Sequence, residues 1–356
     1  MNILQSQSAI DEITATLGSA ESVRFDTEFL REKTYYPSLC LMQIEHNDDI
    51  AVIDPLQGAD LSAFWDALYN CELVVHSGRQ DIEVISLNAG RVPNRLSDTQ
   101  IAAGLCGMSP QVGYAKLVSL VCGVDLDKAH TRTDWSKRPL ASAVLQYAAD
   151  DVRYLGDVAD HLKQQLNTLD RTQWAEQDYA DMLAPALYDN DVDTAWQRIR
   201  GFGNLPTTLQ QKTMLLARWR ESEAQRANRP RQWIIKDDGL INIAALEDAD
   251  IDSIRSTAGV HPRFADRHAR TLVDLLNSEW PVAPAFGPRP DETERKRIKS
   301  MAAAVRHVAA ELEVEAEILA PRRELQAAAR GNANIRALRG WREAIVGQQI
   351  RALMPD

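Results

Sequence analysis

The chain has 356 residues, more than one hydrophobic core usually serves, so two or three domains are expected. Hydrophobic residues make up 45% and charged residues 26%, an ordinary balance for a globular protein. No apolar run approaches the roughly 20 residues that span a bilayer, and this excludes a transmembrane class.

The net charge of −11 would disfavour a nucleic-acid partner if it were spread evenly, but it is not. Residues 1–195 carry 14 Lys and Arg against 30 Asp and Glu, 196–236 carry 9 against 2, and 237–356 carry 17 against 19. An acidic half that needs cations, followed by a basic segment, is compatible with binding a phosphate backbone.

The start of the chain lacks a basic segment followed by an apolar one, so we expect no signal peptide. The four cysteines have no C-x-x-C spacing and lie among apolar residues, as reduced, buried thiols do. Both features predict a cytoplasmic protein.

The first half alternates strand and helix patterns. Strands are predicted at 22–29, 38–45, 49–55 and 72–76, the first three as a meander. Helices are predicted at 57–69, 80–88, 99–105, 114–122 and, as one long helix, about 140–169. This order predicts a mixed α/β sheet flanked by helices.

From residue 194 onward only helical patterns remain, at 206–228, 243–277, 291–312, 316–330 and 335–352. The stretch WPVAPAFGPRP (280–290) holds four prolines and predicts a linker. We therefore expect boundaries near 195–205 and 280–290.

Asp26 and Glu28, in VRFDTEF, lie two apart on a predicted strand, so both side chains point to one face. An isolated D-x-E is more often the wet face of a strand, but Phe25 and Phe29 place this one in an apolar setting. Asp81 follows strand 72–76 at a helix start, where a carboxylate is also favoured by the helix dipole. His76 is a candidate ligand, although a strand-end hydrogen bond is its commoner role.

Tyr147 and Asp151 are i and i+4 on the long predicted helix and share one face. Spacing alone leaves Asp150 as an alternative to Asp151. Carboxylates gathered in apolar places usually share a cation, and oxygen-only ligands favour Mg²⁺ or Mn²⁺. Two such ions about 3.5–4 Å apart are a standard device for cleaving phosphodiesters, so the pattern predicts a metal-dependent nuclease.

The joint order of these motifs resembles the three exonuclease motifs of the DEDD superfamily, in the branch with Tyr in the third motif. Five sequence segments are similar to segments of ribonuclease D: FDTEF, HSGRQDIEV, SDTQIAA, RTDWSKRPL and QYAADDVRYL. The later words GFGNLPTTLQ and LARWRESEAQRANRPRQWIIKDDGL resemble the HRDC segment of that family, and the tail ending in RALRGWREAIVG occupies the place of a second, HRDC-like domain.

The resemblance implies a ribonuclease-H-like exonuclease domain over 1–195, an all-α HRDC domain over 196–282 and a second over 288–356. It implies a 3′–5′ exoribonuclease that uses two divalent ions, Mg²⁺ or Mn²⁺, and releases 5′-mononucleotides from RNA with a single-stranded 3′ end, tRNA precursors among them. The implied metal ligands are Asp26, Glu28, Asp81 and Asp151, the family register selecting Asp151 over Asp150, and Tyr147 would orient the attacking water.

No protein nucleophile, membrane or obligate protein partner is expected. Two alternatives remain at this stage: a DNA exonuclease, because the same carboxylates serve repair enzymes, and a non-catalytic nucleic-acid adaptor. Five arginines of the basic segment are interleaved with Trp219 and Trp233, a composition that suits RNA binding but equally a solvated helix face. These arginines are Arg218, Arg220, Arg226, Arg229 and Arg231.

Overall fold

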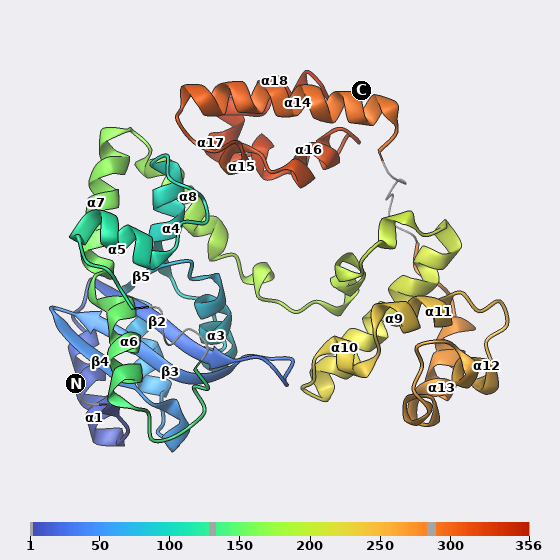
Figure 1. Cartoon of the computed structure of the whole chain (residues 1–356), viewed down its shortest axis with the longest axis horizontal. Helices are drawn as coiled ribbons and strands as arrows, with labels where there is room; N and C mark the ends of the chain where they lie inside the picture. The colour runs from blue at the N-terminus through green and yellow to red at the C-terminus, as the bar shows by residue number, and fades with distance from the viewer. Residues whose placement is uncertain (1–2, 128–132, 283–289, 356) are drawn as a thin grey trace. The chain divides into compact units, whose positions relative to one another are not determined.

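A computed structural model describes residues 3–127, 133–282 and 290–355. It contains the predicted mixed sheet, with six strands in the order β1-β4-β3-β2-β5-β6 (Figure 1). β5 pairs in parallel with β2 and β6, β1 pairs in parallel with β4, and β3 and β4 are antiparallel. The strands are β1 (Ile3–Leu4), β2 (Ser22–Leu30), β3 (Ser38–His46), β4 (Asp49–Ile53), β5 (Glu72–Val75) and β6 (Arg95–Asp98). The four predicted strands are confirmed, whereas β1 and β6 are too short to show an alternating pattern.

Strand β2 shows why the sheet has two different faces. Val23, Phe25 and Thr27 are buried on one side, where Val23 and Phe25 join the apolar core with α1, α2 and α3. The alternate residues Arg24, Asp26 and Glu28 point to the other face, as the two-residue period of a strand requires. One strand therefore supplies both the core and a row of charged groups.

The described part of the first 188 residues also contains eight helices. They are α1 (Gln7–Leu17), α2 (Ser62–Asn70), α3 (Arg79–Ala89), α4 (Thr99–Leu105), α5 (Tyr114–Cys122), α6 (Ser142–Arg153), α7 (Leu155–Thr168) and α8 (Thr172–Met182), with 3₁₀ turns at Pro55–Gln57 and Pro185–Leu187. All four cysteines are free thiols, as expected. None of the helices that the structure describes is long and apolar enough to cross a bilayer.

The long helix predicted over 140–169 is in fact two helices, α6 and α7, that break at Tyr154. The Tyr114 hydroxyl explains the break, because it donates to the Asp150 carbonyl at 3.2 Å and accepts the Tyr154 N–H at 3.2 Å. It thus replaces the helical hydrogen bond between these two backbone groups, and an inserted side chain is a recognised cause of helix kinks. The prediction was wrong because the inserted group lies 36 residues away in sequence.

The chain divides into two compact units, one comprising Met1–Leu30, Leu39–Tyr188 and Glu292–Asp356 and the other Arg31–Ser38 and Asp189–Asp291. The second unit is helical: α9 (Thr207–Arg226), α10 (Arg231–Ile234), α11 (Asp237–Ala244), α12 (Ile251–Ser256) and α13 (Pro262–Leu276), with 3₁₀ turns at Val192–Arg198 and Phe202–Asn204. The single helix predicted over 243–277 is instead the end of α11 followed by α12 and α13. Asp250 begins α12 with a capping box and Pro262 begins α13, and both are helix-start signals.

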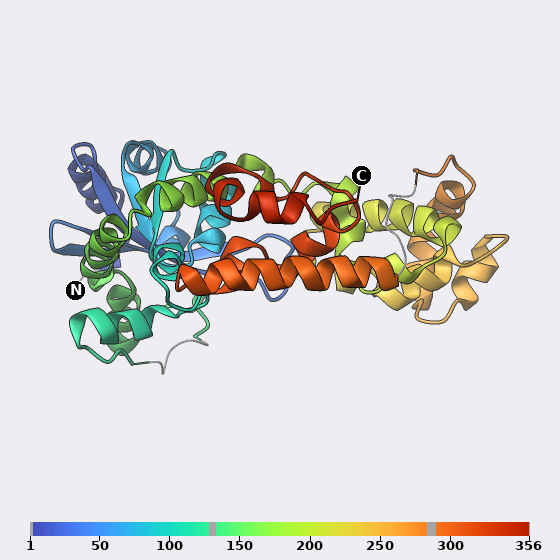
Figure 2. The same ribbon diagram turned by 90° about the horizontal axis from the view of Figure 1, so that it is seen from above.

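Helices of the C-terminal segment belong to the first unit. They are α14 (Glu292–Glu311), α15 (Ala316–Leu319), α16 (Arg322–Ala328), α17 (Gly340–Arg342) and α18 (Gln348–Arg351), with a 3₁₀ turn at Arg336–Leu338 and a π turn at Glu343–Gly347. Figure 2 shows α14 as one continuous helix. The predicted linker 280–290 lies mostly outside the described residues, as does Arg132 of the RTDWSKRPL segment.

These C-terminal helices share one apolar core with α4, α5, α7 and α8. The Trp174 and Trp341 rings stack with centroids 4.4 Å apart. The Arg171 guanidinium donates to the carbonyls of Leu105 and Leu312, both at 2.6 Å. The Arg342 guanidinium binds Asp178 through two hydrogen bonds of 2.5 and 2.7 Å. Residues 292–356 are therefore packed against the sheet-containing part rather than tethered to it.

Loss of Arg342 should destabilise this unit strongly. Arg342→Ala leaves the Asp178 carboxylate, whose side chain is 10% exposed, without its cation, and breaking a buried pair from one side costs about 3–5 kcal/mol. The exposed pair between Arg351 and Glu343 provides the control, because Arg351→Ala should cost less than about 1 kcal/mol. Urea unfolding of the three proteins measures both values, and equal losses would contradict the packing described here.

Candidate active site

The charged face of β2 opens into a cavity of about 390 Å³. Its walls come from β2, from the segment between β5 and α3, from the first turn of α3, and from α5, α6 and α7. All five residues singled out in the sequence line it. The lining residues are Phe25, Asp26, Thr27, Glu28, Phe29, His76, Ser77, Gln80, Asp81, Tyr114, Tyr147, Asp151 and Leu155.

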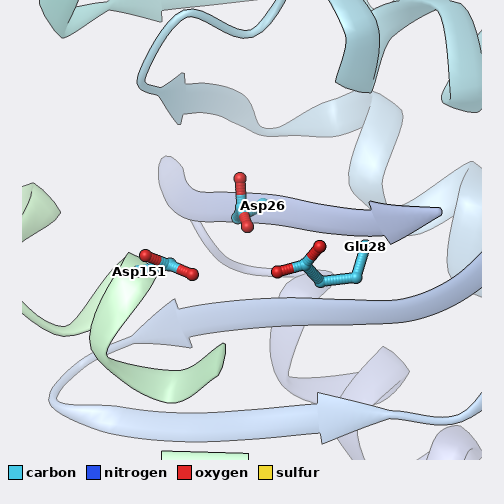
Figure 3. A group of neighbouring side chains, drawn as sticks. All are labelled: Asp26, Glu28 and Asp151. Atoms are coloured by element: carbon cyan, nitrogen blue, oxygen red, sulfur yellow. The ribbon is translucent and has the colours of Figure 1, made fainter. Parts of the chain in front are cut away.

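Three carboxylates meet in this cavity. Asp26 and Glu28 project from β2 and Asp151 from the last turn of α6, and each offers an oxygen within 4.8 Å of the other two (Figure 3). The two-residue spacing on β2 puts the first pair on one face, as the sequence predicted. Asp151 arrives from 123 residues beyond Glu28 in sequence, so only the fold could bring it there.

Asp81 is the fourth carboxylate of the cavity. Its Oδ1 accepts hydrogen bonds from the Thr27 backbone N–H at 3.1 Å and from the Thr27 hydroxyl at 2.5 Å. Thr27 lies between Asp26 and Glu28, so β2 fixes the position of Asp81 directly. Asp81 is 7% exposed and lies in the first turn of α3, so it occupies the expected helix-start position and also faces the cavity.

The start of α3, which carries Asp81, is held by Asp98 at the end of β6. Asp98 accepts the backbone N–H groups of Ser77 at 3.1 Å and Gly78 at 2.8 Å, and it also caps α4. Ser77 has a φ of 58°, a conformation that few residues other than glycine adopt. Two N–H groups bound to one buried carboxylate compensate for that backbone geometry.

The start of α6 is held by Arg138. Its guanidinium binds the fully buried Asp54 at the end of β4 through two hydrogen bonds of 2.6 Å and donates to the Cys40 carbonyl on β3 at 2.8 Å. This contact ties the segment before α6 to the sheet. It therefore positions Tyr147 and Asp151, which lie two and three turns further along the chain.

The structure shows which of the two adjacent aspartates, Asp150 or Asp151, belongs to the site. The Asp150 carboxylate binds Gln146 at 2.8 Å and Arg153 at 2.7 Å on the outer side of α6, whereas Asp151 faces Asp26 and Glu28. Tyr147 lies one turn before Asp151 and lines the same cavity, with its ring 6.3 Å from that of Trp135. His76 also lines the cavity, and its Nδ1 lies 2.9 Å from the Thr99 hydroxyl, the strand-end hydrogen bond that was its commoner expectation.

Burial and mutual repulsion raise the pKa values of all four carboxyls. Burial is the largest cause in each case, and neighbouring acidic groups add to it. The pKa of Glu28 rises to about 8, that of Asp151 to about 7 and that of Asp81 to about 6, and that of Asp26 rises well above its usual range. Burial and the charges of Asp151, Glu28 and Asp26 also raise the pKa of the Tyr147 phenol, which is therefore a neutral hydrogen-bond donor.

This donor set fits a hard divalent cation. It consists of carboxylate oxygens only, which Mg²⁺ and Mn²⁺ prefer over nitrogen or sulfur. Raised carboxyl pKa values identify a place where added positive charge would be favourable, because it would replace the protons that now relieve the repulsion.

Four residues that support the site had no signal in the sequence. Thr27 and Tyr114 hold Asp81 and the end of α6, and Asp98 and Arg138 hold the starts of α3 and α6. Their partners lie far away in sequence, so spacing could not reveal them. Thr27, Asp98 and Arg138 do fall in the family segments FDTEF, SDTQIAA and RTDWSKRPL, which was the available hint.

Within the second unit, the structure changes the interpretation of the basic segment. Arg220 is buried and bound to Asp237 at 2.7 Å, and Arg231 pairs with the buried Glu221 at 3.0 Å. Trp219 packs against Phe264 and is part of the core. Arg220 and Trp219 are therefore structural residues, whereas Trp233 is 59% exposed.

Comparison with known proteins agrees with the fold and the cavity. Residues 1–167 match the family model described as 3′-5′ exonuclease, and residues 214–276 match that of the HRDC domain. The fold and its carboxylate cavity thus define a 3′–5′ exonuclease.

Relatives that match this chain over most of their length identify the family within the class of 3′–5′ exonucleases. The ribonuclease D of Bartonella henselae is 36% identical over 99% of this chain and 90% of its own length, and that of Granulibacter bethesdensis is 37% identical over 96% and 89%. The crystal structure of Escherichia coli RNase D, described as an exoribonuclease involved in structured RNA processing, superposes with a TM-score of 0.90 at 26% identity, covering 99% of this chain and 98% of that one. The chain belongs to the ribonuclease D family and is a 3′–5′ exoribonuclease, which confirms the resemblance and removes the adaptor alternative.

The raised carboxyl pKa values predict how the metal-free protein responds to pH. Glu28 keeps a proton in the folded state that the unfolded state loses near pH 4.5, so its contribution to stability is full below about pH 4.5 and is lost as the pH rises through about 8. Glu28→Gln removes one of the competing charges and should stabilise the EDTA-treated protein by about 1–3 kcal/mol near pH 8, with little effect near pH 5. Denaturant unfolding at both pH values measures this, and an equal effect at the two would refute the charge repulsion.

Proposed function

We propose that the protein hydrolyses RNA from a single-stranded 3′ end with the aid of two divalent metal ions, Mg²⁺ or Mn²⁺, and releases 5′-mononucleotides. One observation carries this proposal: four carboxylates from β2, α3 and α6, one buried and three half-buried, line one cavity, and the three half-buried ones lie within 4.8 Å of one another. The family of the chain supports the reaction class, and the donor chemistry supports the metal.

The proposed metal ligands are Asp26, Glu28, Asp81 and Asp151. When bound, two divalent ions supply the Lewis-acid chemistry that activates water and stabilises the leaving 3′-oxygen. The chain's part is to hold the carboxylates in place through Thr27 and the neighbouring anchors. Ser77 lines the cavity beside His76, but the His76 ring is paired with the Thr99 hydroxyl and not with the Ser77 hydroxyl, so water is the proposed nucleophile.

Tyr147 is proposed to orient that water. Its phenol stays protonated because burial and three carboxylates raise its pKa, so it can donate a hydrogen bond throughout the neutral pH range. Its place one helical turn from Asp151 puts the donor beside the metal-binding face of α6. A fixed donor reduces the reorientation that water needs before attack.

Structured RNAs such as tRNA precursors are the proposed substrates. The support is the description of the Escherichia coli relative, which is involved in structured RNA processing. We also propose the three-domain division 1–195, 196–282 and 288–356, with the last two as HRDC-type domains that contact RNA, and a cytoplasmic location. The HRDC match over 214–276 supports the middle domain.

Asp151→Asn should lower exonuclease activity by at least about 100-fold, because it removes a charge that holds the metal while keeping the side-chain shape. The matched control is Asp150→Asn, which changes the adjacent carboxylate on the outer face of α6 and should retain near-normal activity. The assay follows release of mononucleotides from 3′-labelled RNA with Mg²⁺, with Mn²⁺ and with EDTA. Metal-independent cleavage, or equal loss in both variants, would defeat the assignment, and a matched DNA oligonucleotide tests the remaining alternative of a DNA exonuclease.

Tyr147→Phe should reduce kcat by about 10-fold to 1000-fold and change RNA affinity much less, since the phenol acts on the water and not on the substrate backbone. Single-turnover rates and equilibrium binding separate these two effects. The packing against Trp135 is retained in the variant, so thermal unfolding serves as the folding control. Loss of RNA binding with an unchanged chemical step would show that Tyr147 is a substrate contact.

A further inference from the structure

A second cavity of the first unit lies between the sheet-containing part and the C-terminal helices. Its volume is about 460 Å³, within the usual range of ligand sites. Apolar side chains of α4 and α15, Ile101 and Ile318, form part of its wall. The charged residues of the lining are Arg79, Arg323, Arg336, Arg339 and Arg342 and the acidic Asp178, Asp181 and Glu317.

The excess positive charge of this lining is not used up by internal pairing. Arg342 and Asp178 neutralise each other through their two short hydrogen bonds. Four arginines then face two acidic residues. Arg79, Arg323 and Arg339 are exposed at the cavity, so their guanidinium groups can reach a ligand.

Arg336 carries the clearest sign of an anion site. Its Nε is shielded from solvent, and although Glu324 Oε1 lies 3.5 Å away, no described residue completes a hydrogen bond with this nitrogen. Burial, together with the charge of Arg342, lowers the pKa of the Arg336 guanidinium, although the charges of Asp178, Glu324 and Asp181 oppose this shift. An anion in the cavity would supply the missing acceptor.

The position of the cavity relative to the active site suggests which anion it takes. Arg79 lines the arginine cavity, while Gln80 and Asp81, the next residues of α3, line the active-site cavity. The two cavities are thus neighbours across one helical turn. An RNA strand that places its 3′ end among the carboxylates has its other phosphates nearby. The acidic residues 1–195 would otherwise repel these phosphates.

We propose that this arginine cavity binds backbone phosphates of the RNA strand whose 3′ end occupies the active site. The proposal rests on the function proposed above. Guanidinium groups suit this role because their planar fork matches phosphate oxygens, and the apolar wall offers contact to a ribose or base.

The test compares two double variants that remove the same charge. Arg323→Gln with Arg339→Gln changes two arginines of the cavity, whereas Arg306→Gln with Arg322→Gln changes two exposed arginines of α14 and α16 outside it. Each phosphate contact to single-stranded nucleic acid contributes about 0.7 to the slope of log affinity against log salt, so the cavity variant should lose about 1.4 from that slope with an oligoadenylate of about 20 nucleotides. The control variant should keep the slope of the parent.

Binding is measured by fluorescence anisotropy in the Asp151→Asn background, so that the RNA remains intact. In the active background, the ratio of kcat/KM for the long RNA to kcat/KM for a dinucleotide should fall about 10-fold or more in the cavity variant, corresponding to the two lost contacts. Equal slopes and ratios in the two double variants would overturn the proposal. A titration with AMP covers the other source of phosphate, because AMP binding that the cavity variant abolishes would reassign the cavity to a free nucleotide.

Failure of this proposal and failure of the proposed function remain distinguishable. If the parent protein cleaves RNA but both double variants bind it alike, the cavity assignment fails alone. If the parent shows no metal-dependent cleavage while the slope still differs between the variants, the proposed function fails and the cavity stands.

Discussion

The repulsion among the four carboxylates of the active-site cavity is the constraint on which the rest of the site depends. Asp26, Glu28, Asp81 and Asp151 would separate if the backbone allowed it, because the charges of Asp81 and Asp151 raise the pKa values of Asp26 and Glu28, and the charge of Asp81 also raises the pKa of Asp151. The fold prevents this with three attachments: Thr27 to Asp81, Asp98 to the start of α3, and Arg138 to Asp54 before α6. A divalent cation bound among these carboxylates would therefore recover the stability lost to repulsion.

Features of the site that follow from the regular spacing of side chains on one strand or one helix could be predicted from the sequence. The alternation of β2 predicted that Asp26 and Glu28 share a face, and the helical spacing predicted that Tyr147 and Asp151 do. Spacing could not predict that these two pairs meet in one cavity, because this depends on the strand order and on packing between distant segments. The family resemblance predicted it instead. The break between α6 and α7 was missed for the same reason, since the hydroxyl that causes it belongs to Tyr114.

Charge patterns were the least reliable guide. The basic segment of α9 and α10 suggested an RNA-facing stripe, yet Arg220 is buried with Asp237, and Arg231 pairs with Glu221. A buried guanidinium binds carboxylates and carbonyls of its own domain, whereas an exposed guanidinium can bind a phosphate. The amino-acid composition of the segment is the same in the two cases. Only burial and partners distinguish them, and these come from tertiary structure.

The C-terminal helices have a role beyond their own stability. Their core is continuous with that of α4, α5, α7 and α8, and the Trp174–Trp341 stack and the Arg342–Asp178 pair fix them there. Because of this packing, arginines from a segment about 300 residues along the chain stand beside the start of α3. The carboxylates of the active site repel the phosphates of RNA. An RNA strand therefore approaches them only where positive charge lies close by. The same contacts that stabilise the C-terminal helices therefore place that charge beside the start of α3, where the proposed RNA contact would use it.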